Sequence, residues 1–365
     1  MVTPVVEAVA KNKAKVRVMV VDDSATIRGV LTRWIETEPE LKVVASAFNG
    51  RSALDVVRMA DPDVIVLDIE MPGMDGITAL PLLIKAAPRA KVVMASTLTR
   101  RNAEISLKAL SLGATDYLAK PTSLTADGAA DSFRRDLVAK LLTLGRAGSS
   151  GLQHTSKSLV EPSKTLRLRP ASNVVPQLVA IGSSTGGPQA LAQVITELAP
   201  GLRVPVLITQ HMPATFTSIL AEHLSRISGL KCQEGRAGQS LTPGSVYVAP
   251  GDFHMRIVGR PGTIEITQSP PENFCRPSVD PMFRSVAAAY GPTVLAIVLT
   301  GMGSDGCEGA RAVAMAGGTV IAQDEASSVV WGMPAAVAHA GLASAILPLK
   351  SIAAEARKYL GVGAR

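Results

Sequence analysis

Short apolar runs that alternate with helical patterns are the feature that most constrains the fold of this chain. Between residues 16 and 121, runs of strand length such as "VRVMVV" and "DVIVLDI" are separated by amphipathic stretches such as "ATIRGVLTRWIET". Continuous Val/Ile/Leu runs indicate parallel strands that are buried on both faces. The alternation resumes after residue 175 with "QLVAIG", "VPVLITQ", "SVYVAP" and "TVLAIVLT". The pattern predicts two α/β domains, each built on a doubly wound parallel sheet.

A polar, basic segment separates the two alternating regions. The last helical pattern of the first region spans about residues 131–144, and the residues after it are rich in Gly, Ser, Lys and Arg. Such a segment has too few large apolar side chains to form a core, so we interpret it as a linker. We therefore expect a disordered basic tail at 1–15, a first domain at 16–138, a helix end and flexible linker at 139–175, and a second domain at 176–362.

Composition and charge disfavour several classes of function. The formal net charge is +7, but residues 1–15 and 143–175 carry +2 and +4 of it, so the rest is nearly neutral. The sequence has no helix-turn-helix pattern and no basic patch interleaved with aromatic residues, so it does not indicate binding to nucleic acid. No apolar run approaches the roughly 20 residues of a membrane helix, and no signal-peptide layout begins the chain. We expect a cytoplasmic protein without direct membrane insertion.

Polar side chains follow the apolar runs of the first domain. Asp22 and Asp23 end the first run and Asp68 ends the third, so in a doubly wound sheet these carboxylates line one crevice. Three crowded carboxylates repel one another unless a cation binds them, and hard oxygen ligands suit Mg²⁺. Ser96 and Lys120 end the next two runs and bring a hydroxyl and a positive charge to the same edge. One strand-end aspartate often merely caps a helix, but the whole set favours a functional site.

Three motifs of the first domain carry a family resemblance. With "VVDDSATIR", "LDIEMPGMDG" and "YLAKP", residues 16–138 closely resemble the receiver domain of bacterial response regulators. The resemblance implies that Asp68 is the phosphoacceptor, a carboxylate nucleophile that attacks a phosphorylated donor. It also implies that Asp22 and Asp23 hold Mg²⁺ together with Asp68.

The same resemblance implies roles for residues around the phosphoacceptor. Lys120 and Ser96 would contact the phosphoryl oxygens. Tyr117 matches the aromatic position whose rotamer follows phosphorylation in this family, and its alternative role is that of a half-buried ring at the sheet edge. The phosphodonor would be a chemotaxis histidine kinase.

The stretch "IGSSTGGPQAL" follows the first apolar run of the second domain and has two possible meanings. Pro188 is well placed to begin a helix, and a helix N-terminus preceded by glycines binds anions readily. The stretch is neither a Walker loop nor a G-x-G-x-x-G fingerprint, however, so a phosphate loop has no further support. "GSSTG" also fits the G-x-S-x-G elbow of α/β-hydrolases, but that family places its acid before its histidine, unlike this chain.

A histidine and an aspartate follow two other apolar runs of the second domain. His211 comes directly after "VPVLITQ", and Asp305 follows "TVLAIVLT". Each residue alone could be structural, but a serine needs a base to become nucleophilic and a histidine needs an orienting carboxylate. The sequence therefore predicts a Ser-His-Asp triad at one sheet edge, with a serine of the pair Ser183 and Ser184 as nucleophile. His254, in "DFHMRI", is a candidate for a secondary role at the site.

Six motifs of the second domain carry a second resemblance. "IGSSTGGP", "ITQHMP", "APGDFHM", "RPSVDPMF", "LTGMGSDG" and "QDEASSVVWGMP" resemble the catalytic domain of the chemotaxis protein-glutamate methylesterases, the CheB family, across residues 176–362. The resemblance selects Ser184, immediately before "TGG", as the nucleophile. It assigns His211 as general base and then acid, and Asp305 as the orienting carboxylate.

Further roles follow from this second resemblance alone. The backbone N–H of Met302, together with Thr185, would form the oxyanion hole, and the esterase site would need no cofactor. Cys275 stands where we expect a histidine before "RPSVD", which leaves the substrate role of that flank open.

The two resemblances together imply a flavodoxin-like receiver domain followed by a Rossmann-like hydrolase domain, and a phosphorylation-regulated enzyme. It would hydrolyse glutamate γ-methyl esters on methyl-accepting chemotaxis receptors, release methanol, and deamidate receptor glutamines. We expect the unphosphorylated receiver to pack over the Ser184 crevice, and phosphorylation of Asp68 to shift that equilibrium. Two alternatives stay open: a related serine hydrolase that acts on non-chemotaxis receptors, and a phospho-switched module that binds an anion.

Overall fold

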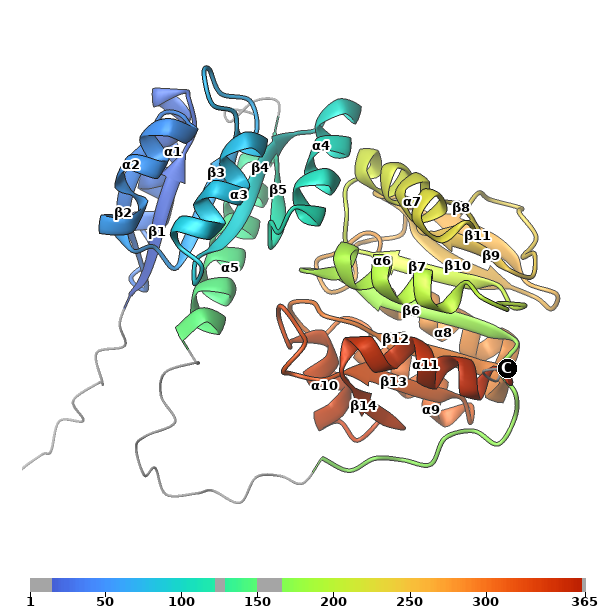
Figure 1. Cartoon of the computed structure of the whole chain (residues 1–365). Coiled ribbons are helices and arrows are strands. Elements are labelled where there is room, and N and C mark those ends of the chain that lie inside the picture. The colour runs from blue at the N-terminus through green and yellow to red at the C-terminus, as the bar shows by residue number, and fades with distance from the viewer. Residues whose placement is uncertain (1–14, 122–128, 150–165, 363–365) are drawn as a thin grey trace, which may run out of the picture.

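The computed structural model describes residues 15–121, 129–149 and 166–362, which form two α/β domains side by side (Figure 1). Apart from Lys15, the expected basic tail lies outside the described residues, and so does the 150–165 part of the expected linker. In the described part of the chain, no helix has the length and apolar character needed to cross a membrane.

The first domain has a five-stranded parallel sheet, as predicted, and its strand order is β2-β1-β3-β4-β5. The strands are β1 (Val16–Val21), β2 (Leu41–Ala47), β3 (Val64–Asp68), β4 (Lys91–Thr97) and β5 (Asp116–Lys120). The helices that cover one face are α1 (Ala25–Glu36) and α5 (Ala129–Ser149), and those on the other are α2 (Gly50–Ala60), α3 (Gly76–Ala86) and α4 (Arg100–Ser111). Helices on both faces bury β3 completely, which explains its continuous apolar run.

The second domain has a seven-stranded parallel sheet in the order β14-β13-β12-β6-β7-β9-β8. Its strands are β6 (Leu178–Ser183), β7 (Val206–Gln210), β8 (Lys231–Glu234), β9 (Ser245–Val248), β12 (Val294–Val298), β13 (Thr319–Gln323) and β14 (Ala345–Leu347). A separate antiparallel ribbon consists of β10 (His254–Val258) and β11 (Thr263–Thr267). The central position of β6, between β12 and β7, decides where the site lies, because the chain leaves β6 directly into the "GSSTGGP" loop.

Helices cover both faces of the second sheet, as the sequence predicts. One face packs against α6 (Gly187–Leu198), α7 (Ala214–Ser228) and α11 (Leu349–Tyr359). The other face packs against α8 (Val279–Tyr290), α9 (Cys307–Met315), the 3₁₀ turn η2 (Gly291–Thr293) and α10 (Met333–His339). The doubly wound architecture is therefore present in both domains.

Helix α5 is longer than the sequence pattern suggests. It extends to Ser149, beyond the expected helix end at residue 144 and beyond residue 138, the expected end of the first domain. The pattern was misleading because Gly145 reads as a helix breaker. In the structure Leu144 is buried in the core of the first domain, and a Cβ atom at position 145 would overlap the side chain of Val16. Gly145 therefore permits close packing of α5 on β1 rather than ending the helix.

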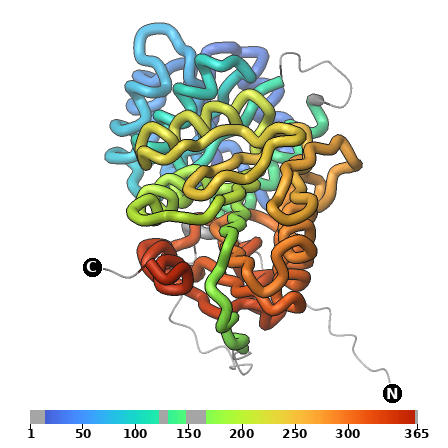
Figure 2. The backbone as a smooth tube through the Cα atoms, turned by 90° about the vertical axis from the view of Figure 1, so that its right-hand side faces the viewer, coloured from blue at the N-terminus to red at the C-terminus, as the bar shows by residue number. Residues whose placement is uncertain are grey.

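The two domains contact each other along α4 and α7 (Figures 1 and 2). Tyr117 of β5 is buried and stacks on Phe216 of α7, with ring centroids 4.5 Å apart and ring planes 8° apart. Arg100 of α4 pairs with Glu222 of α7 at 2.8 Å, and Gln189 Nε2 donates to the carbonyl of Ala114 at 2.9 Å. Because the ring stack is buried and the ion pair is exposed, the stack contributes more to the contact.

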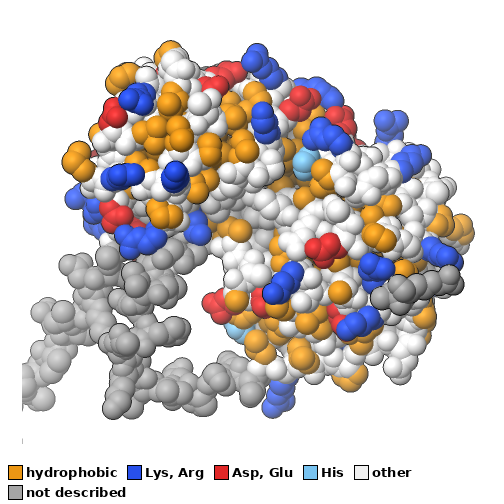
Figure 3. All heavy atoms as spheres, viewed as in Figure 1, with side chains coloured by type: hydrophobic (Ala, Val, Ile, Leu, Met, Phe, Trp, Pro, Cys, Tyr) orange, Lys and Arg blue, Asp and Glu red, His pale blue; other side chains and the backbone are white. Residues whose placement is uncertain are grey.

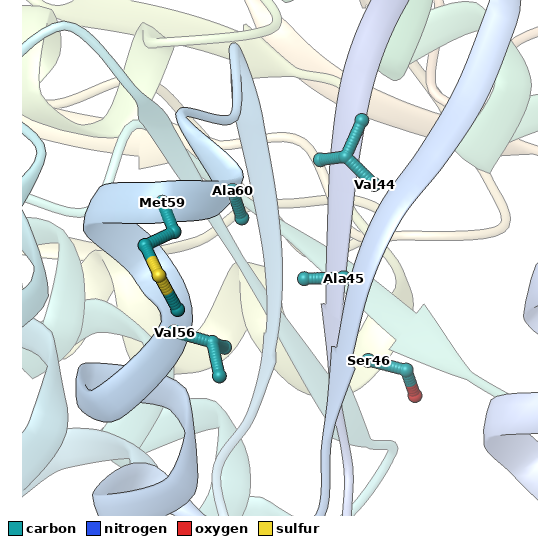
Figure 4. A pocket seen from close by; sticks show the side chains of 6 residues that line it. All are labelled: Val44, Ala45, Ser46, Val56, Met59 and Ala60. Atoms are coloured by element: carbon teal, nitrogen blue, oxygen red, sulfur yellow. The ribbon is translucent and has the colours of Figure 1, made fainter.

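The surface has a hollow that lies apart from the candidate site residues. It has a volume of about 350 Å³ and is lined by side chains of β2 and α2, among them Val44, Val56 and Met59 (Figure 4). Basic side chains are scattered over both domains on the face shown in Figure 3. Neither feature adds a candidate site to those found in the sequence.

The packing of α5 on β1 predicts opposite effects for two helix glycines. Gly145→Ala should lower the free energy of unfolding of the first domain by about 1–3 kcal/mol, because the new methyl group overlaps Val16. Gly29→Ala, in α1, should raise it by about 0.5–1 kcal/mol, because a Cβ atom there meets nothing within 4 Å.

Urea unfolding in a Trp331→Phe background would measure both effects through Trp34 fluorescence. Trp34 suits this purpose because its ring lies 6.1 Å from that of Phe133 in α5. Equal stability of the two glycine variants would contradict the packing of α5 described above.

Candidate functional site

Three carboxylates gather at the carboxyl edge of the first sheet. Asp22 and Asp23 follow β1, Asp68 ends β3, and one oxygen atom from each lies within 4.8 Å of the others. Neither Asp22 nor Asp23 caps α1, because the Ser24 hydroxyl accepts from the N–H of Ile27 at 3.3 Å. The donor set consists of hard oxygen ligands, which fits Mg²⁺.

Lys120 joins this carboxylate group from the end of β5. Its Nζ lies 2.6 Å from Asp22 Oδ2 and 2.7 Å from Asp68 Oδ1, and all three side chains are nearly buried. Burial raises the pKa of Asp68 to about 6, although Lys120 opposes that rise. The structure thus places the partly desolvated carboxylate of Asp68 beside the fixed positive charge of Lys120, at the carboxyl edge of the sheet.

Ser96 lies near the same edge but faces away from Asp68. Its hydroxyl is buried and lies 3.3 Å from the carbonyl oxygens of Thr97 and Asn102, at the start of α4. The Thr97 hydroxyl accepts from Asn102 Nδ2 at 2.6 Å. A contact between Ser96 and a phosphoryl group on Asp68 would therefore require the hydroxyl to turn.

Ser184 lies where the chain leaves the central strand β6. Its N–H donates to the carbonyl of Thr300 at 3.0 Å, and its carbonyl accepts from Gln210 Nε2 at 2.9 Å. Gly301 passes so close that a Cβ atom there would lie 2.9 Å from Ser184 Cβ. These contacts fix the serine between the loops that follow β7 and β12, the two strands that flank β6.

Ser183, the other serine of the pair, is fully buried. Its hydroxyl donates to Gln210 Oε1 at 2.7 Å. This geometry gives Ser183 a structural role and leaves Ser184, which is half-buried, as the hydroxyl at the site.

His211 and Asp305 form the central contact of the second site. His211 Nε2 lies 2.7 Å from Asp305 Oδ2, so Nδ1 is the ring nitrogen left for another partner. Among the described residues, the Ser184 hydroxyl has no hydrogen bond to His211 in this structure. The structure thus brings the base and the carboxylate together and places the serine on the adjacent strand end.

Asp305 is held at the N-terminus of α8. The N–H groups of Val279 and Asp280, the first two residues of that helix, donate to its carboxylate at 2.6 and 3.1 Å. Ser278 Oγ and Asn273 Nδ2 donate to Asp305 Oδ1 at 2.7 and 2.9 Å. A helix N-terminus favours a negative charge, so this environment keeps Asp305 ionised and fixed.

Ser278 and Asn273 are functional contacts that sequence reasoning missed. Ser278 belongs to the motif "RPSVDPMF", so its neighbourhood was noted, but nothing in the pattern showed that the hydroxyl reaches Asp305. Asn273 lies in an irregular turn without any periodic signal.

The pKa shifts of the pair follow from these contacts. Burial opposes ionisation of Asp305, but the bonds from His211, Val279 and Ser278 outweigh it and lower the pKa of Asp305 to about 2. Burial also disfavours a charged His211, but the contacts with Asp305 and Cys275 outweigh it and raise the pKa of His211 to about 10. The surroundings thus favour the imidazolium, the form that a base takes once it has accepted a proton.

The two candidate oxyanion donors belong to two segments that adjoin Ser184, its own loop and the loop of Gly301. Thr185 follows the serine, and Met302 follows Gly301. Within the described residues, neither backbone N–H donates a hydrogen bond in this structure. Both groups are therefore free to bind an oxygen atom.

His254 is a structural residue rather than a member of the site. It is fully buried in β10, where Nδ1 accepts from the N–H of Ser278 at 3.2 Å and Nε2 lies 3.1 Å from the carbonyl of Pro270. His254 therefore supports the residue that holds Asp305 and does not face Ser184.

Two family models match the chain. The model described as CheB methylesterase matches residues 179–356, and the model described as response regulator receiver domain matches residues 18–126. These two segments correspond to the two sheets.

Curated relatives match the chain over most of its length. A protein-glutamate methylesterase/protein-glutamine glutaminase from Azospirillum brasilense is 54% identical over 94% of this chain and 92% of that relative. A relative of the same name, of the group 2 operon of Rhodospirillum centenum, is 51% identical over 92% of each. The crystal structure of the Thermotoga maritima CheB methylesterase catalytic domain has 40% identity and a TM-score of 0.49, over 51% of this chain and 99% of that one.

The His211–Asp305 contact predicts an unusual titration. In histidine NMR spectra, His211 should keep its proton well above its ordinary pKa of 6.5, whereas His223 should titrate below that value because of burial and Arg226. Asp305→Asn should lower the pKa of His211. Since the pKa is raised in the folded state, the stability gained from the pair is complete below about pH 6.5 and is lost as the pH rises through about 10. A His211 signal that titrates near 6.5 would contradict the contact.

Proposed function

The chain belongs to the family of protein-glutamate methylesterases that carry a receiver domain, and from this premise we propose how its residues act. It is a carboxylic ester hydrolase that removes γ-methyl esters from glutamate side chains and deamidates glutamines, under the control of phosphorylation. The observation that carries the mechanism is the His211–Asp305 contact beside Ser184. We assign the receiver to the first domain, which begins at residue 16 and extends past the predicted boundary at 138 because α5 packs in its core as far as Leu144, and the esterase to residues 176–362.

In this mechanism Ser184 attacks the ester carbonyl while Nδ1 of the neutral form of His211 accepts the serine proton. Because the pKa of His211 is raised to about 10, the fraction of this neutral form, and with it the rate, should grow as the pH rises. Asp305, held by the N-terminus of α8, orients the ring and stabilises the imidazolium. The oxygen that becomes negatively charged faces the N–H groups of Thr185 and Met302, and the loss of one such donor costs about 2.7–4 kcal/mol of transition-state stabilisation.

The proton on His211 then completes the reaction. His211 donates it to the leaving methoxide, which departs as methanol, and water hydrolyses the ester between Ser184 and the glutamyl group with the same base. In deamidation the leaving group is ammonia. These steps use only groups of the protein, so the esterase site is proposed to need no cofactor.

In the receiver, we assign Asp68 as the phosphoacceptor. Asp22, Asp23 and Asp68 would hold Mg²⁺, which supplies charge neutralisation at the phosphoryl group when it is bound. Lys120, already paired with Asp68, would bind a phosphoryl oxygen, and Ser96 would turn to bind another. The phosphodonor would be a chemotaxis histidine kinase.

Contacts between the domains support inhibition by the unphosphorylated receiver. Thr143 of α5 lies with its hydroxyl 3.3 Å from the sulfur of Met302, the residue assigned to the oxyanion hole. Val329 and Val330, which flank the same loop, pack against the apolar core around α5. The receiver thus rests on the loop beside Ser184, as expected if it restricts access to the esterase site. Phosphorylation of Asp68 would shift the protein away from this docked state.

We propose methyl-accepting chemotaxis receptors as the protein substrates and the cytoplasm as the place of reaction. The relatives' names support the glutamate ester and the glutamine as reacting groups. No role in nucleic-acid binding is proposed.

The function predicts methanol release from methylated receptor membranes, stimulated by Mg²⁺ and a small phosphodonor. Ser184→Ala should reduce release by at least about a thousandfold, because it removes the nucleophile. Asp68→Ala should keep the basal rate and lose the stimulation. A Ser184→Ala variant that hydrolyses esters as fast as the wild type would refute the triad and favour an anion-binding loop.

Inhibition by the receiver predicts the behaviour of a fragment. Residues 166–365, without the receiver, should release methanol several-fold faster than the unphosphorylated full chain, because Thr143 no longer lies against Met302. The fragment should not respond to the phosphodonor. A fragment no faster than the unphosphorylated full chain would show that the receiver does not inhibit.

A further inference from the structure

A second nucleophilic side chain contacts the base of the esterase site. Cys275 Sγ lies 3.4 Å from His211 Nδ1, while Nε2 of the same ring lies 2.7 Å from Asp305. Hydrolases activate serine and cysteine by the same chain of contacts, in which the nucleophile touches a base and the base touches an orienting carboxylate. Cys275 therefore occupies the ring nitrogen that Ser184 needs.

The turn that carries Cys275 is fixed to the site. Glu272 and Cys275 exchange both of their backbone hydrogen bonds, at 3.2 and 2.9 Å, which closes a tight turn. Inside it, Asn273 Nδ2 donates to Asp305 and to Asp280, each at 2.9 Å. Two carboxylates, Asp305 and Asp280, thus hold the turn through Asn273 and fix the thiol beside His211. One of them, Asp305, is the carboxylate that orients the His211 ring.

The same turn brings the thiol close to solvent. Phe274, next in the chain, is 97% exposed, and Cys275 itself is half-buried. Because Cys275 is half-buried rather than buried, we expect a small reagent to reach it without unfolding of the turn. The exposed neighbour and the buried imidazole give Cys275 the combination of access and activation that reactive cysteines show.

As far as the structure describes the chain, the other two cysteines have no base beside the sulfur: Cys232 Sγ lies near the Ser228 hydroxyl and Cys307 Sγ near the carbonyl of Ala336. Burial raises the pKa of Cys232 to about 11, and burial together with Glu308 raises the pKa of Cys307. A raised pKa lowers the thiolate fraction and hence the reactivity. The labelling rates of Cys232 and Cys307 thus provide a reference, within the same protein, for the labelling rate of Cys275.

We propose that Cys275 is a thiol-modification site that uses His211 as its base and that modification there stops the esterase. The chemistry is exchange with a small disulfide or thiosulfonate. His211 Nδ1 accepts the thiol proton, the thiolate attacks one sulfur of the reagent, a new S–S bond forms, and the other half leaves as thiolate or sulfinate. A reducing thiol reverses the exchange. The effect on turnover rests on the proposed function, because it requires His211 to serve Ser184.

Methyl methanethiosulfonate tests the pair in the full chain. Mass spectrometry would follow labelling of each cysteine, and methanol release would follow turnover in the same samples. We expect Cys275 to label at least about tenfold faster than Cys307, with loss of turnover that dithiothreitol restores. Cys275→Ser should keep its own untreated rate after exposure to the reagent, whereas the matched control Cys307→Ser should lose turnover as the wild type does.

Two further variants separate the pair from the esterase. His211→Gln should slow Cys275 labelling at least about tenfold, with the slow labelling of Cys307 unchanged as a check on folding. Ser184→Ala should label as fast as the wild type. Labelling of Cys275 that is no faster than that of Cys307, or that ignores His211→Gln, would overturn the proposal. Fast labelling that depends on His211, in a protein without esterase activity, would support the pair and contradict the proposed function instead.

Discussion

The parallel pairing of β6 between β12 and β7 is the constraint on which the esterase site depends. It brings three strand ends to one edge, so that Ser184, His211 and the loop carrying Asp305 meet although they lie far apart in the sequence. The N-terminus of α8 then holds Asp305 in its ionised form. The site of the receiver depends on the same geometry. Its carboxylates and its lysine follow or end β1, β3 and β5, and the carboxyl ends of these parallel strands lie at one edge of the sheet.

Strand-end residues were the part of the site that could be predicted from the sequence. A buried parallel strand needs a continuous apolar run, and the first polar residue after it must lie at the carboxyl edge. This logic identified Asp22, Asp68, His211 and the serine pair as edge residues. It did not predict β8 and β14. These edge strands have 4 and 3 residues, which is too short for a clear apolar run. It also misjudged the end of α5, because a glycine that permits close packing and one that ends a helix look alike in sequence.

Contacts made by irregular turns could not be predicted. Asn273 and Phe274 both adopt left-handed backbone angles, with φ of 52° and 61°, so the direction of the Cys275 side chain depends on two unusual residues before it. No periodicity encodes such a turn, and its anchors, Asp305 and Asp280, come from other segments. The stack of Tyr117 on Phe216 could not be predicted either, because the sequence marks Tyr117 as a switch residue or a ring at the sheet edge but does not indicate its partner in the other domain.

That ring stack lies within an apolar core that continues from the receiver into α7. The two domains share this core when they are docked. The packing of the core and the phosphorylation of Asp68 would therefore act on the same equilibrium, the one between docked and undocked receiver. Each additional 1.4 kcal/mol or so of docking lowers the undocked fraction about tenfold. Tighter packing around Tyr117 would thus lower the activity of the unphosphorylated enzyme and raise the level of phosphorylation needed to activate it. Looser packing would raise that basal activity and lower the level of phosphorylation needed. In the proposed mechanism the interface would determine how far phosphorylation can raise the activity, while the triad would determine the maximum rate.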